Sequence, residues 1–186
     1  MSVFETIADL FSRRGAEAYF GEQVSILEHS LQTAYFARAA GASAPLVVAA
    51  LLHDVGHLVG NAPADIADWH EDAHHEEVGR AWLARYFGAE ISGPVALHVP
   101  AKRYLCATDP AYIACLSSAS VLTLKLQGGP MSAAEIAAFE ATPHHRDAVA
   151  IRRCDDQGKL GNFRAPVLET YRDLIAELQV ERRVIG

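Results

Sequence analysis

One stretch of the chain carries both its fold and its chemistry: Leu46-Val47-Val48-Ala49-Ala50-Leu51-Leu52-His53-Asp54-Val55-Gly56-His57. The unbroken apolar run at its start predicts a helix that is apolar all round and therefore buried and central. Pro45 lies at a first-turn position behind the cap candidate Ser43, so we expect the helix over residues 45–59. His53 and His57 are four residues apart and would project from one face of that helix, with Asp54 about 100° round its axis.

The polar end of this stretch predicts a metal site. Polar groups in an apolar helix need partners, because burying one unsatisfied costs about 1–3 kcal/mol. Imidazole is the commonest metal ligand among side chains, and a carboxylate can bridge two metal ions, which imidazole cannot. Hydrogen-bonded core residues, or a turn at Gly56, are the alternative. The density of polar groups favours metal binding over that alternative.

The rest of the sequence predicts helices almost throughout. Apolar residues recur with helical spacing over residues 3–14, 25–40, 73–87, 131–139, 144–156 and 166–182. We expect a short helix around His98, after Gly93-Pro94, and a further helical region over residues 110–128. Residues 60–72, with Pro63 and Trp69, form a polar stretch long enough for a lid or substrate loop. No segment predicts a strand, so we expect an all-α bundle.

Length, charge and composition narrow the class of protein. The 186 residues suit one domain spanning residues 1–186, and the net charge of -7 argues against a general nucleic-acid binder. No signal peptide or membrane span is predicted, and three scattered cysteines build neither a disulfide framework nor a zinc site. These features favour a cytoplasmic protein. Nine histidines are many for this length and suggest metal chemistry.

Further ligand candidates occur on other predicted helices. They are His29, the pair His74-His75, His98, and the pair Asp155-Asp156. Taken singly, each is more often a satisfied surface or core residue than a ligand. Taken together, imidazoles and carboxylates without thiolates suit iron, manganese or zinc.

The order His29, His53-Asp54 and a distant Asp155 resembles the HD-domain superfamily, a helical bundle with the elements H…HD…D. The variant HD-x-G-H, followed by two more histidines, resembles the dinuclear branch. This resemblance implies that one metal is held by His29, His53, Asp54 and Asp155. It implies that Asp54 bridges to a second metal held by His75 and His98. His74 is the alternative to His75, and Asp156 the alternative to Asp155.

Several segments resemble the phosphonate-degrading HD oxygenases of the PhnZ type. They are Tyr19-Phe20-Gly21-Glu22, His98-Val99-Pro100-Ala101-Lys102-Arg103-Tyr104, residues 116–131, and Arg152-Arg153-Cys154-Asp155-Asp156-Gln157-Gly158-Lys159. The resemblance covers about residues 15–175. Cys154 departs from the pattern, which has an aromatic residue at this position. The difference affects packing beside Asp155 and not the binding of metal.

What the resemblance implies is a mixed-valent diiron oxygenase, with Fe2+/Fe3+, that uses O2 to cleave a carbon–phosphorus bond. Its substrate would be 2-amino-1-hydroxyethylphosphonate, giving phosphate and glycine, or the N-trimethylated analogue, giving phosphate and glycine betaine. Tyr19 would occupy the open iron position until substrate displaces it, and Glu22 would hold the amine. His57, Lys102 and Ser120 would contact the phosphonate.

Some alternatives stay open. A metal-dependent HD phosphohydrolase acting on a nucleotide or another phosphate ester is the runner-up, and there the metals would activate water. A metal-free regulatory HD module is disfavoured, because no ligand position is degraded. A trimethylammonium group would prefer aromatic faces, for which Tyr19, Trp69 and Tyr104 are candidates. The sequence does not decide whether the chain forms a homo-oligomer.

Overall fold

The computed structural model describes residues 1–19, 21–60 and 74–180, and these form helices joined by turns. The elements are α1 (Val3–Arg14), α2 (Ile26–Ala39), α3 (Ala44–Leu51), α4 (Val55–Val59), α5 (His75–Leu83), α6 (Ala89–Thr108), α7 (Pro110–Ala114), α8 (Ser118–Leu126), α9 (Ala133–Glu140), α10 (His145–Gln157), the 3-10 helix η2 (Leu168–Tyr171) and α11 (Arg172–Leu178). The described residues contain no strand beyond two isolated bridges. The prediction of an all-α bundle is confirmed.

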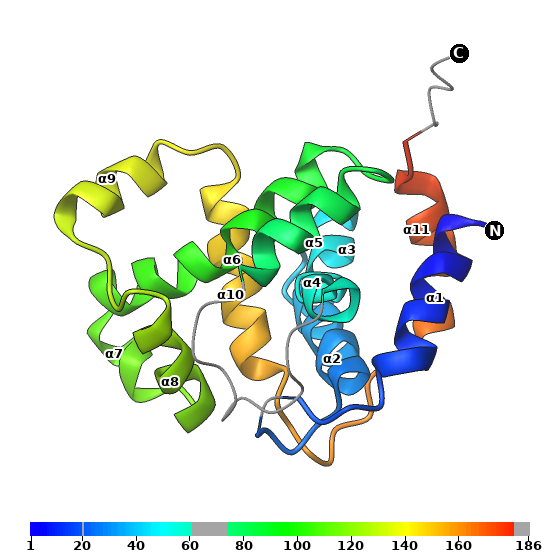
Figure 1. Ribbon diagram of the computed structural model, residues 1–186, viewed down its shortest axis with the longest axis horizontal. Coiled ribbons are helices and arrows are strands. Elements are labelled where there is room, and N and C mark those ends of the chain that lie inside the picture. Colours follow the sequence, from blue (N-terminus) through cyan, green and yellow to red (C-terminus); the bar gives the residue numbers. More distant parts are fainter. Residues whose placement is uncertain (20, 61–73, 181–186) are drawn as a thin grey trace.

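The long helix α6 lies at the centre of the bundle. It packs against α3, α5 and α10, while α2 packs against α3 and α10. Figure 1 shows α1 and α11 at one end of the molecule and α7, α8 and α9 at the other. The largest apolar cluster includes Ala49, Ala50, Leu51 and Leu52, all fully buried. The expectation that the apolar run of residues 46–52 is central is therefore confirmed.

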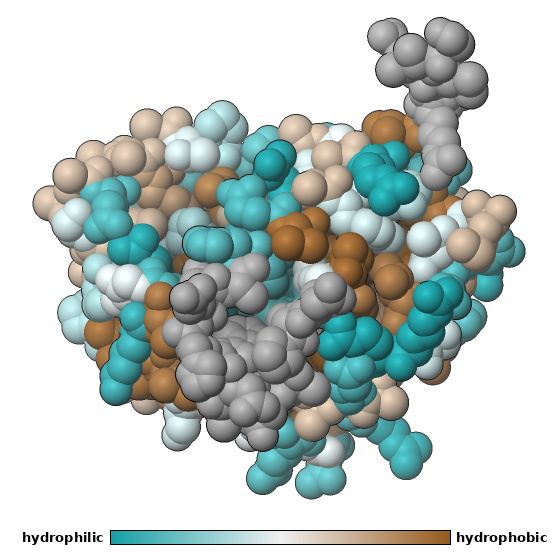
Figure 2. All heavy atoms as spheres, viewed as in Figure 1, coloured by the Kyte–Doolittle hydropathy of each residue, from teal (hydrophilic) through white to brown (hydrophobic). Residues whose placement is uncertain are grey.

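Helix ends follow local capping chemistry. The side chains of Ser2, Ser25 and Ser132 each accept a hydrogen bond from the backbone N–H three residues later, and a glutamate there returns a bond to the cap backbone. Ser132 and Glu135 at the start of α9 form one of these capping boxes. Figure 2 shows hydrophilic and hydrophobic residues interspersed over the coloured part of one face. Scattered apolar residues of this kind are normal on a protein surface.

The predicted helix over residues 45–59 is wrong as a continuous element. Helix α3 ends at Leu51, residues 52–54 form a turn, and α4 begins at Val55. The helical argument that placed His53 and His57 on one face therefore fails. The break lets α4 lie directly against α5: a Cβ added at Gly56 would be 1.9 Å from the carbonyl oxygen of His75. The helix is therefore interrupted within the motif, and the end of the motif packs against α5.

Other boundaries also differ from expectation. A short helix was expected after Gly93-Pro94, but α6 runs through both Pro94 and Pro100. Proline normally breaks a helix by removing a hydrogen bond, whereas α6 stays helical through both prolines and packs against α3, α5, α7, α9 and α10. The expected region 110–128 is split into α7 and α8, and the last helix is divided into η2 and α11.

The expected lid or loop at residues 60–72, including Pro63 and Trp69, lies outside the described residues apart from Gly60. Among the described helices, none combines the length and apolar character needed to cross a membrane.

Candidate metal centre

Two histidines from α2 and the turn after α3 form the first pair of the site. The Nε2 atoms of His29 and His53 lie 3.2 Å apart, and both side chains are fully buried. Their Nδ1 atoms lie 2.8 Å from the carbonyl oxygens of Gly158 and Ala50 respectively. A carbonyl only accepts, so each Nδ1 carries the hydrogen and each neutral ring directs an Nε2 lone pair at the other. Such an arrangement needs a cation or a proton between the rings.

A second pair repeats this arrangement on α5 and α6. The Nε2 atoms of His75 and His98 lie 3.0 Å apart, and His98 donates from Nδ1 to the carbonyl of Val95 at 2.7 Å. Both rings are buried.

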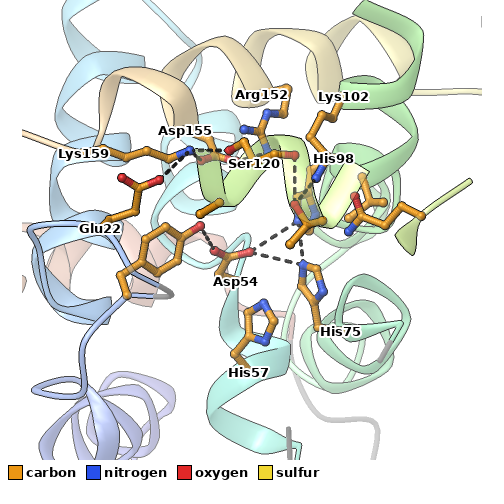
Figure 3. Close-up of a pocket in the computed structure, with 15 residues that line it drawn as sticks. Glu22, Asp54, His57, His75, His98, Lys102, Ser120, Arg152, Asp155 and Lys159 are labelled. Carbon is orange, nitrogen blue, oxygen red and sulfur yellow. Dashed lines mark hydrogen bonds and ion pairs between the residues drawn. The ribbon is translucent and has the colours of Figure 1, made fainter. Parts of the chain in front are cut away.

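Asp54 lies between the two pairs, as Figure 3 shows for His75 and His98. Its Oδ2 is 3.3 Å from Nε2 of His53 and 3.7 Å from that of His29. Its Oδ1 is 3.4 Å and 3.3 Å from the Nε2 atoms of His75 and His98. One carboxylate oxygen therefore faces each histidine pair. Four imidazoles around one carboxylate, which belongs to both groups of candidate ligands, fit a pair of divalent transition-metal ions.

Asp155, near the end of α10, lies beside the first histidine pair. Its Oδ1 lies 3.5 Å from Nε2 of His29 and its Oδ2 3.7 Å from that of His53. Oδ1 is buried without a hydrogen-bond partner among the described residues, and Arg152 holds Oδ2 at 2.6 Å. Asp156 faces away from this centre, toward Tyr112 and the guanidinium of Arg152. Between the two alternatives, Asp155 is thus the one beside the histidines.

Exposure and orientation likewise distinguish the two adjacent candidates His74 and His75. The His74 side chain is 71% exposed, on a residue with left-handed backbone (φ 46°), whereas the His75 side chain is 7% exposed and faces Asp54. Gly56 and Gly79 allow this placement, because a Cβ at Gly79 would lie 3.3 Å from the backbone nitrogen of Gly56. Close approach of α4 and α5 therefore sets His75 beside the motif.

The charges at the centre indicate where a cation belongs. Burial lowers the pKa of His53, but Asp54 and Asp155 outweigh it and raise that pKa to about 9. Burial lowers the pKa of His29 to about 4, despite the nearby Asp155. Burial would raise the pKa of Asp54, but His53 and the other histidines hold it well below its usual range. A proton on His53 thus balances the carboxylates, and a metal ion would replace it.

Tyr19 and Glu22 lie beside the first pair. The Tyr19 hydroxyl donates to Oδ2 of Asp54 at 2.7 Å, and its ring stacks on His29 with centroids 3.8 Å apart. The Oε1 of Glu22 accepts a hydrogen bond from the Ser117 hydroxyl and lies 3.9 Å from the Lys159 ammonium. Tyr19 therefore contacts the carboxylate of Asp54, whereas Glu22 lies at the pocket wall.

A pocket opens beside the centre and includes the three residues expected to contact an anion. Lys102 is 3% exposed, and its ammonium donates to Thr123 Oγ1 at 2.8 Å. Ser120 accepts from Lys159 at 2.9 Å, and the His57 ring stacks on His75 with centroids 3.9 Å apart. Burial lowers the pKa of Lys102 to about 7, and the neighbouring Arg152 adds to this. Figure 3 shows the cationic side chains on one side of the pocket and His57 on the other.

The structure also adds pocket residues that the sequence analysis did not single out. They are Val99, Ala119, Thr123, Gln127, Arg152 and Lys159. Thr123 and Gln127 follow Ser120 by three and seven residues, the spacing of one helical face, so periodicity could have found them. Tyr104, by contrast, does not line the pocket: it is half-buried and donates to Glu140. Trp69 lies outside the described residues, and Tyr19 is the one aromatic candidate that lines the pocket among the residues that the structure describes.

Comparisons with known proteins identify the family of the chain. A family model described as the HD domain matches residues 26–116. The chain is 44% identical to (1-hydroxy-2-(trimethylamino)ethyl)phosphonate dioxygenase (glycine-betaine-forming) of Leisingera caerulea, over 89% of this chain and 84% of the relative. It is 42% identical to hydroxymethylphosphonate dioxygenase of Gimesia maris, over 91% of this chain and 83% of the relative. Asp155 lies beyond the HD-domain match but within a bundle that brings it to the same centre.

Proposed function

The chain belongs to the PhnZ-type HD-domain phosphonate oxygenases, and from this premise we propose that it uses O2 to cleave the carbon–phosphorus bond of a 1-hydroxyphosphonate bearing an amine. For 2-amino-1-hydroxyethylphosphonate the products would be glycine and phosphate, and for the N-trimethylated analogue glycine betaine and phosphate. In this reaction O2 accepts four electrons, and both its oxygen atoms are accounted for in the carboxylate and phosphate. We also propose that the chain is a single domain, that it acts in the cytoplasm, and that its partner is a small-molecule substrate.

The observation that carries the proposal is the position of Asp54 between two histidine pairs beside a pocket with a buried lysine. We propose that His29, His53 and Asp155 hold one iron ion, His75 and His98 hold a second, and Asp54 bridges them. When bound, the irons supply the redox chemistry that activates O2. Imidazole and carboxylate ligands suit this use of iron.

The pocket residues would bind and orient the substrate. Lys102 would pair with the phosphonate, because a dianion in a water-poor site requires compensating charge and Lys102 is its most buried lysine. Ser120 and His57 would supply further contacts. Tyr19 would leave Asp54 when substrate enters. Glu22, which already faces one ammonium group on Lys159, would accept the substrate's cationic amine.

Phosphate-ester hydrolysis remains the competing function. It would use the same metal ligands to activate water and would not require O2. Tyr19 favours the oxygenase, because its hydroxyl contacts the bridging carboxylate and its ring covers His29. A hydrolase has no evident need for an aromatic residue in that position.

The test compares substrates and gas phases in one assay. Iron-loaded protein is incubated with the primary amine, its N-trimethylated analogue, hydroxymethylphosphonate or a nucleotide, each with O2 and without it. We expect O2-dependent release of phosphate with glycine or glycine betaine. Release from the nucleotide without O2 would overturn the proposal in favour of hydrolysis. Turnover of hydroxymethylphosphonate alone would overturn the requirement for an amine.

A further inference from the structure

The four histidines of the centre are not held in the same way. His29, His53 and His98 each donate from Nδ1 to a backbone carbonyl at 2.7–2.8 Å. The Nδ1 atom of His75 is buried but has no hydrogen-bond partner among the described residues. A ring that presents Nε2 to a metal must carry its hydrogen on Nδ1, and a buried donor requires an acceptor.

The nearest candidate acceptor is the carboxylate of the next residue. The Oε2 of Glu76 lies 3.6 Å from Nδ1 of His75. Glu76 is 6% exposed, and Oε2 is likewise buried without a hydrogen-bond partner within the described parts of the chain. Its Oε1 lies 3.8 Å from Nδ1 of the exposed His74. Two unsatisfied atoms, one able to donate and one able to accept, therefore face each other just beyond hydrogen-bonding distance.

We propose that Glu76 is a positioning residue for the second metal, accepting the Nδ1 hydrogen of His75 once Nε2 binds the ion. A carboxylate in this place fixes the orientation and tautomer of the ring and makes Nε2 a stronger donor to the metal. The other histidines gain orientation from neutral carbonyls, so this effect would be confined to one of the two ions. The proposal rests on the proposed metal pair but not on the identity of the substrate.

Helix α5 offers a matched control. Glu77 follows Glu76 on the same helix turn, but its side chain is 58% exposed and pairs with Arg80 at the surface. Glu76→Gln keeps the shape of the side chain and an amide oxygen that can accept weakly, whereas Glu76→Leu removes the acceptor. Glu77→Gln makes the same chemical change without altering the surroundings of His75.

The experiment measures metal release and folding stability separately. Each protein is loaded with iron, both ions are removed by a competing chelator, and thermal unfolding is followed with and without metal. We expect affinity for one ion to fall about tenfold in Glu76→Gln and about 100-fold in Glu76→Leu, with the other ion retained. Glu77→Gln should match the wild type. In the Mössbauer spectrum, only one of the two iron environments should change.

Stability of the metal-free proteins separates positioning from a structural role. Because Glu76→Gln removes a buried carboxylate whose Oε2 has no hydrogen-bond partner among the described residues, we expect the metal-free variant to melt no lower than the wild type. Unchanged affinity for both ions in Glu76→Leu would overturn the proposal. Equal weakening of both ions together with a lower metal-free melting temperature would also overturn it. If the wild type binds two metal ions but cleaves no phosphonate, the proposed function is wrong and the role proposed for Glu76 is unaffected.

Discussion

The two halves of the metal centre differ in how the chain holds them. The first half consists of His29, His53 and Asp155, and the second of His75 and His98. In the first half, both imidazoles are fully buried and anchored on backbone carbonyls, and Tyr19 covers one ring. In the second half, His98 is anchored in the same way on the carbonyl of Val95, whereas the buried His75 begins α5 and faces a side-chain carboxylate instead of a carbonyl.

This difference predicts unequal metal sites. Backbone anchors inside a packed bundle move little, because displacing them would disrupt core packing. The His75 ring, whose Nδ1 has only the Glu76 carboxylate nearby at 3.6 Å among the described residues, has more freedom to turn. We therefore expect the first half to bind its ion more tightly and release it more slowly than the second.

The largest effect should come from removing the residue that both halves share. Asp54→Ala deletes the carboxylate whose two oxygens face the two histidine pairs. We expect loss of most bound metal and a fall in turnover of about 1000-fold or more, since ligand loss exceeds the 10–100-fold effect of a supporting residue. Metal analysis and phosphate release measure these outcomes. Retention of two ions by the variant would refute the assignment of Asp54 as a bridge.

Removing one histidine from each half tests whether the two halves bind metal with different affinity. We expect His75→Ala to keep one ion in the first half with roughly wild-type affinity, and His53→Ala to lose that ion with an affinity drop of about 100-fold or more. Stopped-flow chelation of the wild type should show two release phases at least about tenfold apart. A single release phase in the wild type, or equal metal loss in both variants, would mean that the halves are energetically equivalent.

Lys102→Met tests whether the pocket beside the second half binds substrate and not metal. Loss of a buried charge-assisted hydrogen bond costs about 2 kcal/mol, so KM should rise about 30-fold. The metal content should not change. Lys125→Met is the control, because Lys125 lies on α8, which also lines the pocket, but is exposed. An unchanged KM in Lys102→Met would remove Lys102 from the anion site.

The smallest expected effect is the pH dependence of phosphonate binding. The pKa of Lys102 lies at about 7 in the free protein, because of burial and Arg152, and a bound dianion would raise it. Above pH 7 the free lysine is neutral and must take up a proton on binding, so affinity should fall by up to about tenfold per pH unit. Below pH 7 the free lysine is already protonated, so it adds no pH dependence to the affinity for the phosphonate. Calorimetry in buffers of different ionisation enthalpy measures the proton uptake, which Lys102→Met should abolish.

Several parts of the site could be predicted because they rest on local patterns. The apolar run of residues 46–52 requires burial whatever surrounds it, and the structure places it in the core. The spacing from His98 to Lys102 is one helical turn, so both side chains lie on the same side of α6 and reach the same pocket. Histidines and carboxylates without thiolates predict iron, manganese or zinc, and the identity of the metal stays a prediction.

Other parts depended on contacts between distant segments. The end of the motif was expected to continue as a helix, but close packing of Gly56 against α5 accompanies a break there. Helix propensity is a weak prior that tertiary packing overrides. For the same reason Pro94 and Pro100 did not end α6. Helical spacing alone could not separate His75 from His74, because the left-handed backbone at His74 turns the two side chains apart.

The sequence by itself determined an all-helical chain with a buried HD motif and a metal-binding set of side chains. These conclusions follow from periodicity and ligand chemistry, which are local properties. The family resemblance implied Asp54 and Asp155 as ligands, but only the tertiary structure decided that the two oxygens of Asp54 face different histidine pairs, that Asp155 lies beside the first pair, and that Glu76 faces Nδ1 of His75. Distances of a few ångströms between residues far apart in the chain depend on how helices pack, and local patterns carry no information about them.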